Sequence, residues 1–303
     1  MRSVQIIKQI LLTVFASVLF VACSNETKQP ADTLTSGTID ISVDETFRPI
    51  IEEQLKVFDS SFPEAHIRVH YKPEAECIKD FLNDSARLIL VTRDLSPDEL
   101  KLLEAKKVVP TALALAKDAV AVIVNNSSPD SMLSISQLKG ILTGKYKDPY
   151  TVVFDNQGSS TLRYMLDSII PGQQLGANVF AAKNSDSVIA YVAANPGAIG
   201  FVGVSHVSDF SDPEGLAFTT QTTVAAIFND SLREVYKPYQ AYIAPEYYPL
   251  TRKLYYIHRE TYPGLGTGFA NFLSKERGQL IFKQSRLFPL RTNIIFREAN
   301  VNQ

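Results

Sequence analysis

Short apolar segments alternate along the chain with longer segments in which apolar residues recur every three or four positions. Residues 39–43 and 66–71 alternate apolar and polar side chains, which is typical of strands with one covered face. Residues 88–91 are apolar without alternation, as in a parallel sheet that is covered on both faces. The other predicted strands are residues 111–116, 119–124, 152–154, 198–202 and 254–257.

A segment in which apolar residues have helical spacing follows most of these strands. Ser96, followed by a proline and two acids, and Ser134 have the residue types that begin helices, and Gly144 has the type that ends one. The remaining predicted features are a helix opening at residues 44–46, a turn at 73–77, and helices over 78–82, from 185 and over 269–283. This alternation predicts the α/β fold class with a mostly parallel sheet.

The N-terminus has the pattern of a targeting segment. Two positive residues, Arg2 and Lys8, precede an apolar stretch over residues 10–22 that is too short for a membrane span. It ends at Cys23 in a sequence that resembles a bacterial lipobox. We therefore expect a signal peptide over residues 1–23, lipidation of Cys23 and a polar, flexible tether over residues 24–36.

Charge and cysteine content exclude several classes of protein. The net charge is -2, and loss of the signal peptide would move it to about -4. That balance, without a basic stripe, argues against nucleic-acid binding, so any anion must be attracted by local groups. If Cys23 carries lipid, Cys77 has no partner for a disulfide within a monomer, and a packed small residue is favoured over a reactive thiol.

The segment from Val152 to Arg163 carries the strongest candidate chemistry. An apolar strand leads into a turn with the sequence Gly-Ser-Ser-Thr at residues 158–161, and a helical pattern follows. A helix begins with unpaired N–H groups that favour an anion, and hydroxyl groups add donors without adding charge. The alternative is that Ser159 or Ser160 serves only as an N-cap.

Other motifs in the chain do not support enzymatic chemistry. Residues 140–146 resemble a phosphate-binding loop but have the wrong glycine spacing, and residues 264–268 lack the dinucleotide-binding spacing. No nucleophile elbow, paired cysteines or helical histidine pair is present. We therefore predict a protein that is not an enzyme and that has no cofactor and no metal site.

Several segments, taken in order, resemble the periplasmic phosphate-binding proteins. They extend over essentially the whole mature chain. They are KDAVAVIVN (117–125), ISQLKGILTG (135–144), GSST (158–161), NPGAIGFVG (195–203), YPLTRKLY (248–255) and the last predicted helix. The resemblance implies the two-lobe type II periplasmic-binding-protein fold, in which two α/β lobes close on an oxyanion for an ABC importer in the inner membrane.

The resemblance also implies boundaries and site residues. Residues 37–120 and 252–297 would form lobe I, and residues 121–251 would form lobe II. The expected ligand-binding residues are Thr46, Phe47, Thr92, Ser159, Ser160 and Thr161. The expected partners are phosphate or a related oxyanion, the permease and the membrane through the lipid anchor, and the expected state is a monomer in the cell envelope.

Acidic residues replace family residues near this site. Asp155 stands where the family has an arginine, and Glu74 lies in a loop that is rich in serine and glycine in the family. Arg48, Arg93 or Arg163 could supply the missing cation, although each has a surface role as its default interpretation. Asp155, Glu74, Arg93 and Arg163 are therefore further candidates.

The acidic changes leave two alternatives to an oxyanion importer component. The same fold could bind a phosphorylated or cationic metabolite, as a sensor or interaction module. A cell-envelope hydrolase is disfavoured because no nucleophile motif is present.

Overall fold

The computed structural model describes residues 32–209, 211–212 and 217–292. The predicted signal peptide, Cys23 and the first part of the predicted tether lie outside these residues. Among the residues that are described, no helix combines the length and apolar character needed to cross a membrane.

The strands form one large mixed sheet and one small sheet. The main order is β2-β1-β3-β12-β4-β8-β6-β7, with β9 and β13 also paired to β4, and the small sheet has the order β11-β10-β5. The bounds are β1 Gly37–Asp44, β2 Ala65–Lys72, β3 Leu88–Val91, β4 Thr111–Val124, β5 Met132–Ser134, β6 Thr151–Phe154, β7 Val179–Ala181, β8 Ala198–Gly203, β9 Thr223–Val224, β10 Ala226–Asn229, β11 Glu234–Tyr236, β12 Thr251–His258 and β13 Phe288–Pro289.

Helices and short helical turns connect these strands. Their bounds are η1 Glu45–Phe47, α2 Arg48–Ser61, α3 Glu74–Leu82, α4 Pro97–Ala105, α5 Ile135–Leu142, α6 Ser160–Tyr164, η2 Met165–Ile169, α7 Ser185–Ala194, η3 Val204–His206, α8 Gln240–Ile243, α9 Leu265–Ser274 and α10 Glu276–Gln284. The predicted α/β class is therefore confirmed.

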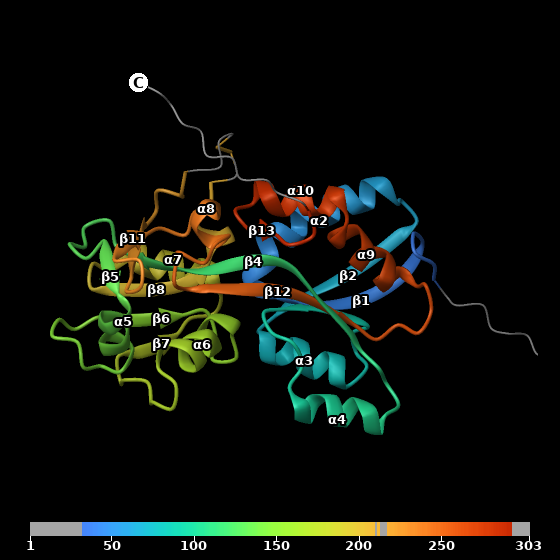
Figure 1. Ribbon diagram of the computed structural model, residues 1–303, viewed down its shortest axis with the longest axis horizontal. Helices are drawn as coiled ribbons and strands as arrows, with labels where there is room; N and C mark the ends of the chain where they lie inside the picture. Colours follow the sequence, from blue (N-terminus) through green and yellow to red (C-terminus); the bar gives the residue numbers. More distant parts are fainter. Residues whose placement is uncertain (1–31, 210, 213–216, 293–303) are drawn as a thin grey trace, which may run out of the picture. The chain divides into compact units, whose positions relative to one another are not determined.

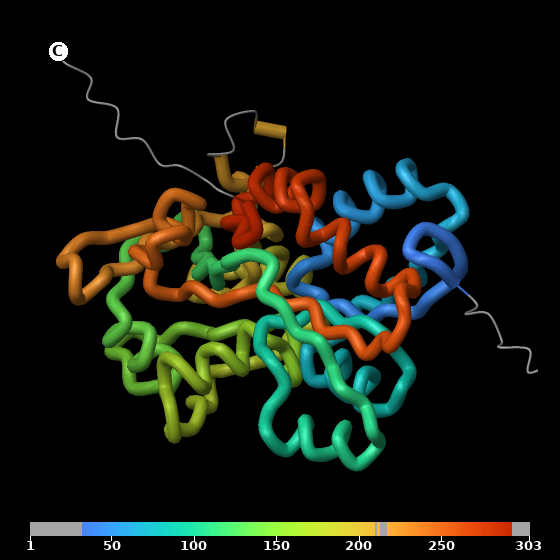
Figure 2. Tube along the Cα trace, turned by 45° about the vertical axis from the view of Figure 1, so that its right-hand side comes forward, coloured from blue at the N-terminus to red at the C-terminus, as the bar shows by residue number. Residues whose placement is uncertain are grey.

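Two long strands join the halves of the large sheet. The pairs β1–β2 and β1–β3 are parallel, as are β6–β7 and β6–β8, whereas β4 pairs antiparallel with β12 on one side and with β8 on the other. Figures 1 and 2 show β4 and β12 passing through the middle of the molecule between the two halves. The chain boundaries predicted for the two lobes remain a prediction.

Both faces of the first half are covered by helices. Leu88 and Leu90 of β3 belong to the core that also contains α2, α9 and α10 residues, whereas Ile89 and Val91 pack with α3 and α4. Figure 1 shows α3 and α4 on the side opposite to α2, α9 and α10. The run of apolar residues without alternation was therefore correctly interpreted as a strand covered on both faces.

Local signals fixed several helix ends. Ser96 and Ser134 each form a capping box, with Glu99 and Gln137 respectively, at the starts of α4 and α5. Gly144, with a φ of 70°, follows the end of α5. These predictions are confirmed.

Two predicted elements are wrong. Residues 74–77 are not a turn, because α3 already begins at Glu74 after Pro73. Residues 269–283 do not form one helix, because Lys275 is extended and separates α9 from α10. The break lets Gly278 approach the end of α9 so closely that an added Cβ would lie 2.4 Å from the Phe272 carbonyl oxygen.

The described end of the predicted tether is held against the protein. Asp32 is buried and forms an ion pair with Arg87, with a distance of 2.7 Å from Arg87 Nη2 to Asp32 Oδ2. It also accepts hydrogen bonds from the Tyr262 hydroxyl and the Leu265 backbone N–H. The first described residue of the predicted tether is therefore fixed.

Candidate functional site

Polar side chains from both halves of the sheet meet at Arg252. Arg252 Nη2 donates to Thr46 Oγ1 at 3.2 Å, and Nη1 donates to Ser160 Oγ at 2.8 Å. Thr46 lies in η1 after β1, Ser160 opens α6 beyond β6, and Arg252 lies on the crossing strand β12. The structure therefore brings together the two turns that the sequence predicted to share a site.

The hydroxyl groups in the turn before α6 form hydrogen bonds with groups of the same segment. Ser159 is the N-cap and accepts from the Leu162 N–H at 3.2 Å, as the alternative interpretation of this serine expected. Its hydroxyl also lies 2.9 Å from Thr161 Oγ1, and Thr161 Oγ1 donates to Asp155 Oδ1 at 2.6 Å. The turn therefore caps α6, and its role in ligand binding stays a prediction.

A second polar group links the halves beside this turn. Glu74 Oε1 accepts from the Thr92 backbone N–H at 2.7 Å and from Thr92 Oγ1 at 2.6 Å. Arg163 Nε donates to Glu74 Oε2 at 2.5 Å, and Arg163 Nη2 donates to Thr92 Oγ1 at 2.7 Å. Because Arg163 belongs to α6 and the other two follow β2 and β3, this group also joins the two halves.

Backbone contacts bring the halves close around these side chains. The Ala75 N–H donates to the Gly158 carbonyl at 3.2 Å, and Ser205 Oγ donates to the Thr46 carbonyl at 3.1 Å. A Cβ at Gly203 would lie 3.1 Å from the same Thr46 oxygen, so a side chain there would crowd η1. The small residues permit this close approach.

The structure separates the candidates into two sets. Thr46, Thr92, Ser159, Ser160, Thr161, Glu74, Asp155 and Arg163 belong to the cluster described above, and Phe47 lies beneath it with its ring centroid 5.5 Å from Arg252 Cζ. Arg93 is not brought to the cluster, because both of its Nη atoms bind the Glu99 carboxylate at 2.8 Å. Arg48 is also elsewhere, stacked on the Tyr71 ring.

Three residues of the cluster were missed by the sequence analysis. Arg252 Nε donates to Asp118 Oδ2 at 2.7 Å, and Asp44 Oδ1 accepts from the Thr46 N–H at 3.1 Å. Arg252 and Asp118 are paired directly across β12 and β4. Each of the three stands close to the end of a predicted apolar strand, and this was the available signal, since charged residues are seldom buried without a partner.

Burial and neighbouring charges shift the protonation of these groups. Burial and the nearby Glu74 raise the pKa of Asp44 to about 7. Burial would also raise the pKa of Glu74, but Arg163 and the bonds from Thr92 hold it below its usual value. Burial raises the pKa of Asp118 in spite of the opposing effect of Arg252. The carboxylates of the cluster therefore differ in their tendency to hold a proton.

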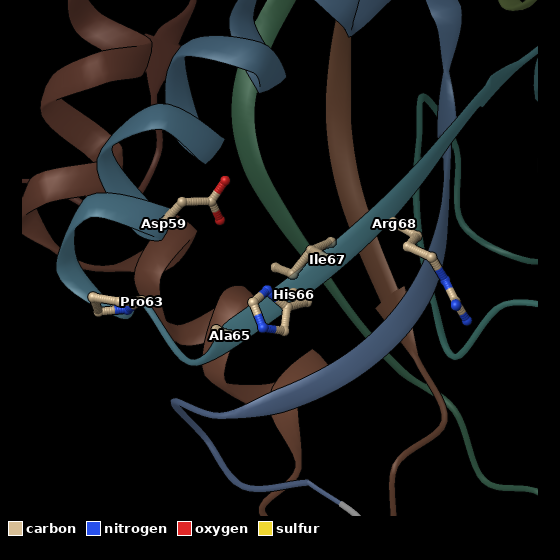
Figure 3. Close-up of a pocket in the computed structure, with 6 residues that line it drawn as sticks. All are labelled: Asp59, Pro63, Ala65, His66, Ile67 and Arg68. Carbon is tan, nitrogen blue, oxygen red and sulfur yellow. The ribbon is translucent and has the colours of Figure 1, made fainter.

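The part of the cluster that the structure describes has no metal-binding arrangement, and one of two surface hollows reaches the cluster at Arg252. Among the described residues, no group of three or more His, Cys, Asp or Glu side chains could hold a metal ion. A hollow of about 270 Å³ lies between α2 and β2, and Figure 3 shows Asp59 and His66 beside it. A hollow of about 260 Å³ beside Lys117, Glu246 and Lys253 includes Arg252 in its lining.

Comparisons with known proteins agree on one fold. A family profile described as "PBP superfamily domain" matches residues 28–276. The phosphate-binding protein PstS of Bacillus subtilis is 23% identical over 294 residues, which cover 92% of this chain and 90% of that protein. PstS 2 of Streptococcus pneumoniae is 25% identical over 126 residues, which cover 42% of this chain and 41% of that protein.

Solved structures give the same result. A Clostridium perfringens protein crystallised with bound phosphate aligns with a TM-score of 0.71 and 20% identity, over 84% of this chain and 100% of that one. An ABC-type phosphate transport receptor from Vibrio cholerae aligns with a TM-score of 0.63 and 18% identity, over 84% and 100% of the two chains. The predicted two-lobe architecture and the predicted resemblance are thereby confirmed.

Proposed function

The chain belongs to the PBP superfamily, and from that premise we propose that it is a solute-binding protein that captures an oxyanion for an ABC importer. We propose phosphate as the oxyanion, because the relatives named above are phosphate-binding proteins. We further propose that the mature protein is a monomer, anchored in the cell envelope through a lipid on Cys23.

One observation carries the proposal. Arg252 donates to a hydroxyl from each half of the sheet, at Thr46 and at Ser160. A guanidinium group has five N–H donors, and these two bonds with the one to Asp118 use three of them. The remaining donors suit the oxygens of a tetrahedral anion, because guanidinium groups bind phosphate through several parallel hydrogen bonds.

A second candidate ligand is a cationic or phosphorylated metabolite bound by the same cluster. The observation in its favour is the number of acids, since Asp44, Glu74, Asp118 and Asp155 are all buried, whereas the arginines that pair with them among the described residues are Arg163 and Arg252. We place it second because the resemblance assigns the two hydroxyl turns to an anion, and Arg252 donates a hydrogen bond to each of them. A hydrolase remains disfavoured, because the named relatives are binding and transport proteins.

Calorimetry with phosphate, with sulfate as the reference anion, tests the proposal. Ser160→Ala removes the hydroxyl that accepts from Arg252, and we expect it to weaken phosphate binding by about 1–3 kcal/mol. Ser60→Ala is the matched control, because Ser60 is exposed on α2 and bonds only within its own helix. Absence of any heat with phosphate at high micromolar concentration would remove phosphate as the ligand.

A further inference from the structure

The glycine-rich segment at residues 264–268, which leads into α9, receives residues that precede β1. A Cβ at Gly268 would lie 1.8 Å from the carbonyl oxygen of Leu34, and a Cβ at Gly264 would lie 3.0 Å from Asp32 Oδ2. Atoms that are not bonded to each other do not approach to 1.8 Å, so only glycine permits the contact with Leu34. The start of α9 is therefore shaped to accept the chain that enters the sheet.

Asp32 is held at this place by four hydrogen bonds. Arg87 Nη1 and Nη2 donate to Oδ1 and Oδ2 at 3.0 and 2.7 Å, and the Tyr262 hydroxyl and the Leu265 N–H each donate at 2.6 Å. The carboxylate takes the place of a capping side chain, because Gly264 at the N-cap of α9 has none. Burial would raise the pKa of Asp32, but these bonds hold it at about 2, so the carboxylate is ionised at neutral pH.

Residues 33–36 continue this contact as a turn with its own hydrogen bonds. The Thr33 N–H donates to the Ser36 carbonyl at 3.0 Å, and the hydroxyl groups of the same two residues lie 2.8 Å apart. β1 then begins at Gly37, whose N–H donates to the Glu64 carbonyl at 2.9 Å. Residues 32–36, which we call the strap, are therefore bonded to the protein along their whole length.

The partners of the strap belong to one half of the molecule. Arg87 lies directly before β3, Tyr262 lies between β12 and α9, and α9 packs against β1. Figure 1 shows β1 and α9 on the side of the molecule opposite to β5 and β11. A pull on the strap therefore acts on the half that contains β1.

We infer, on the basis of the proposed lipid anchor, that the start of α9 is a docking site for the tether, and that the strap fastens the anchored chain to the half that contains β1. The folded part is then attached at Asp32, nine residues after Cys23, and not at Gly37, fourteen residues after it. An extended chain spans at most about 3.3–3.6 Å for each residue, so docking shortens the greatest reach from about 50 Å to about 30 Å.

Docking also determines where a protease can free the protein from its anchor. The side chains of residues 33–35 are exposed, but their backbone must leave Arg87 and α9 before it can extend into a protease. Cleavage of a folded chain depends on such local opening. We therefore expect cleavage that releases the protein to fall before Asp32.

Proteolysis of the anchored chain tests this directly. The mature chain can be coupled through the Cys23 thiol to a maleimide lipid in phosphatidylcholine vesicles, because Cys77 is buried. Proteinase K then releases protein from the vesicles, and mass spectrometry identifies the first residue of the product. We expect the product from the parent to retain the whole strap.

Two variants release the strap by different routes. Asp32→Asn removes the charge that Arg87 binds, and Gly268→Ala displaces Leu34 without altering Asp32. We expect each to raise the rate of cleavage within residues 33–36 by about tenfold or more, because hydrogen bonds to a charged group are among the stronger ones. Asp98→Asn is the matched control, because Asp98 is exposed on α4 with its side chain 90% accessible.

Two results would overturn the inference. One is cleavage within residues 33–36 of the parent as fast as cleavage before Asp32, and the other is a rate in both variants that equals the rate in the parent. Calorimetry with phosphate on the uncoupled chain separates this inference from the proposed function. A chain that binds phosphate but is cut within the strap overturns only the docking of the tether, whereas a chain with a protected strap that binds no phosphate supports the docking and overturns only the proposed ligand.

Discussion

Arg252 and Asp118 form an ion pair that is buried on both sides, with side-chain exposures of 3% and 1%. Replacing Arg252 by methionine keeps most of the volume but leaves Asp118 without its cation. Removal of one partner from a buried pair costs about 3–5 kcal/mol, because the remaining charge is not compensated. We therefore expect Arg252→Met to lose about that much stability at neutral pH.

The double variant Arg252→Met with Asp118→Leu separates the charge from the packing. Replacing a whole buried pair by apolar residues is often neutral or stabilising, so we expect the double variant to recover most of the stability. Phosphate binding should stay lost in the double variant, because the donors to Thr46 and Ser160 are absent. Recovery of stability without recovery of binding would distinguish a ligand-binding arginine from one needed only for folding.

The pH dependence of the stability lost in Arg252→Met is a second test of the ion pair. Burial raises the pKa of Asp118 even in the parent, and loss of Arg252 would raise it further. A raised native pKa gives stability at low pH that is lost as pH rises, so the cost of Arg252→Met should be smaller near pH 5 than near pH 8. Urea unfolding followed by circular dichroism at the two pH values measures it.

Arg68→Met serves as the control, because Arg68 pairs with Asp40 at the exposed edge of the sheet and its side chain is 64% accessible. We expect little change in stability from this variant. The reasoning fails if Arg252→Met costs the same at both pH values and the double variant is no more stable than the single one.

Three further predictions concern substitutions of single residues. The native pKa of Asp44 is raised from 3.8 to about 7, so the parent loses stability as pH rises across that interval. The gain in the free energy of unfolding from Asp44→Asn should therefore be larger at pH 8 than at pH 4, by on the order of a few kcal/mol. Urea unfolding at both pH values measures this, and equal effects would contradict it. Ser159→Ala should cost about 1 kcal/mol through the lost cap on the Leu162 N–H, with Ser159→Gly costing only a few tenths; equal melting temperatures for the two variants would contradict a capping role. Gly268→Ala should release residues 33–36, because the added Cβ would lie 1.8 Å from the Leu34 carbonyl oxygen; limited proteolysis would detect the release, and an unchanged cleavage pattern would show that α9 accommodates the methyl group.

The fold was predictable where local signals and periodicity agreed. The signal for some elements lies in a few adjacent residues. This holds for the capping boxes at Ser96 and Ser134 and for the apolar run at residues 88–91. The break at Lys275 was not predictable in this way, since neither proline nor glycine stands at that position and the close approach of Gly278 to the preceding helix is a tertiary contact.

The site was predictable only in part, for a similar reason. The hydroxyl turns at Thr46 and at residues 159–161 are short motifs, so a resemblance could locate them. The pair of Arg252 with Asp118 joins residues 134 positions apart. Their cross-strand register depends on how β12 and β4 align, which the sequence pattern of either strand alone does not determine.

The position of Arg252 has a mechanical consequence that an arginine in the turn at residue 155 would not have. Arg252 is held in the ladder between β12 and β4, the strands that connect the two halves. Its bonds to Thr46 and Ser160 reach one hydroxyl on each half, so any motion that separates the halves must break at least one of them. The cation would therefore stay at the junction if the hydroxyl turns moved apart, and the bonds to Arg252 stabilise only the arrangement in which both turns are close. An oxyanion that bound the remaining donors of Arg252 together with donors from both turns would strengthen that same arrangement, because a ligand favours the state in which it makes more contacts.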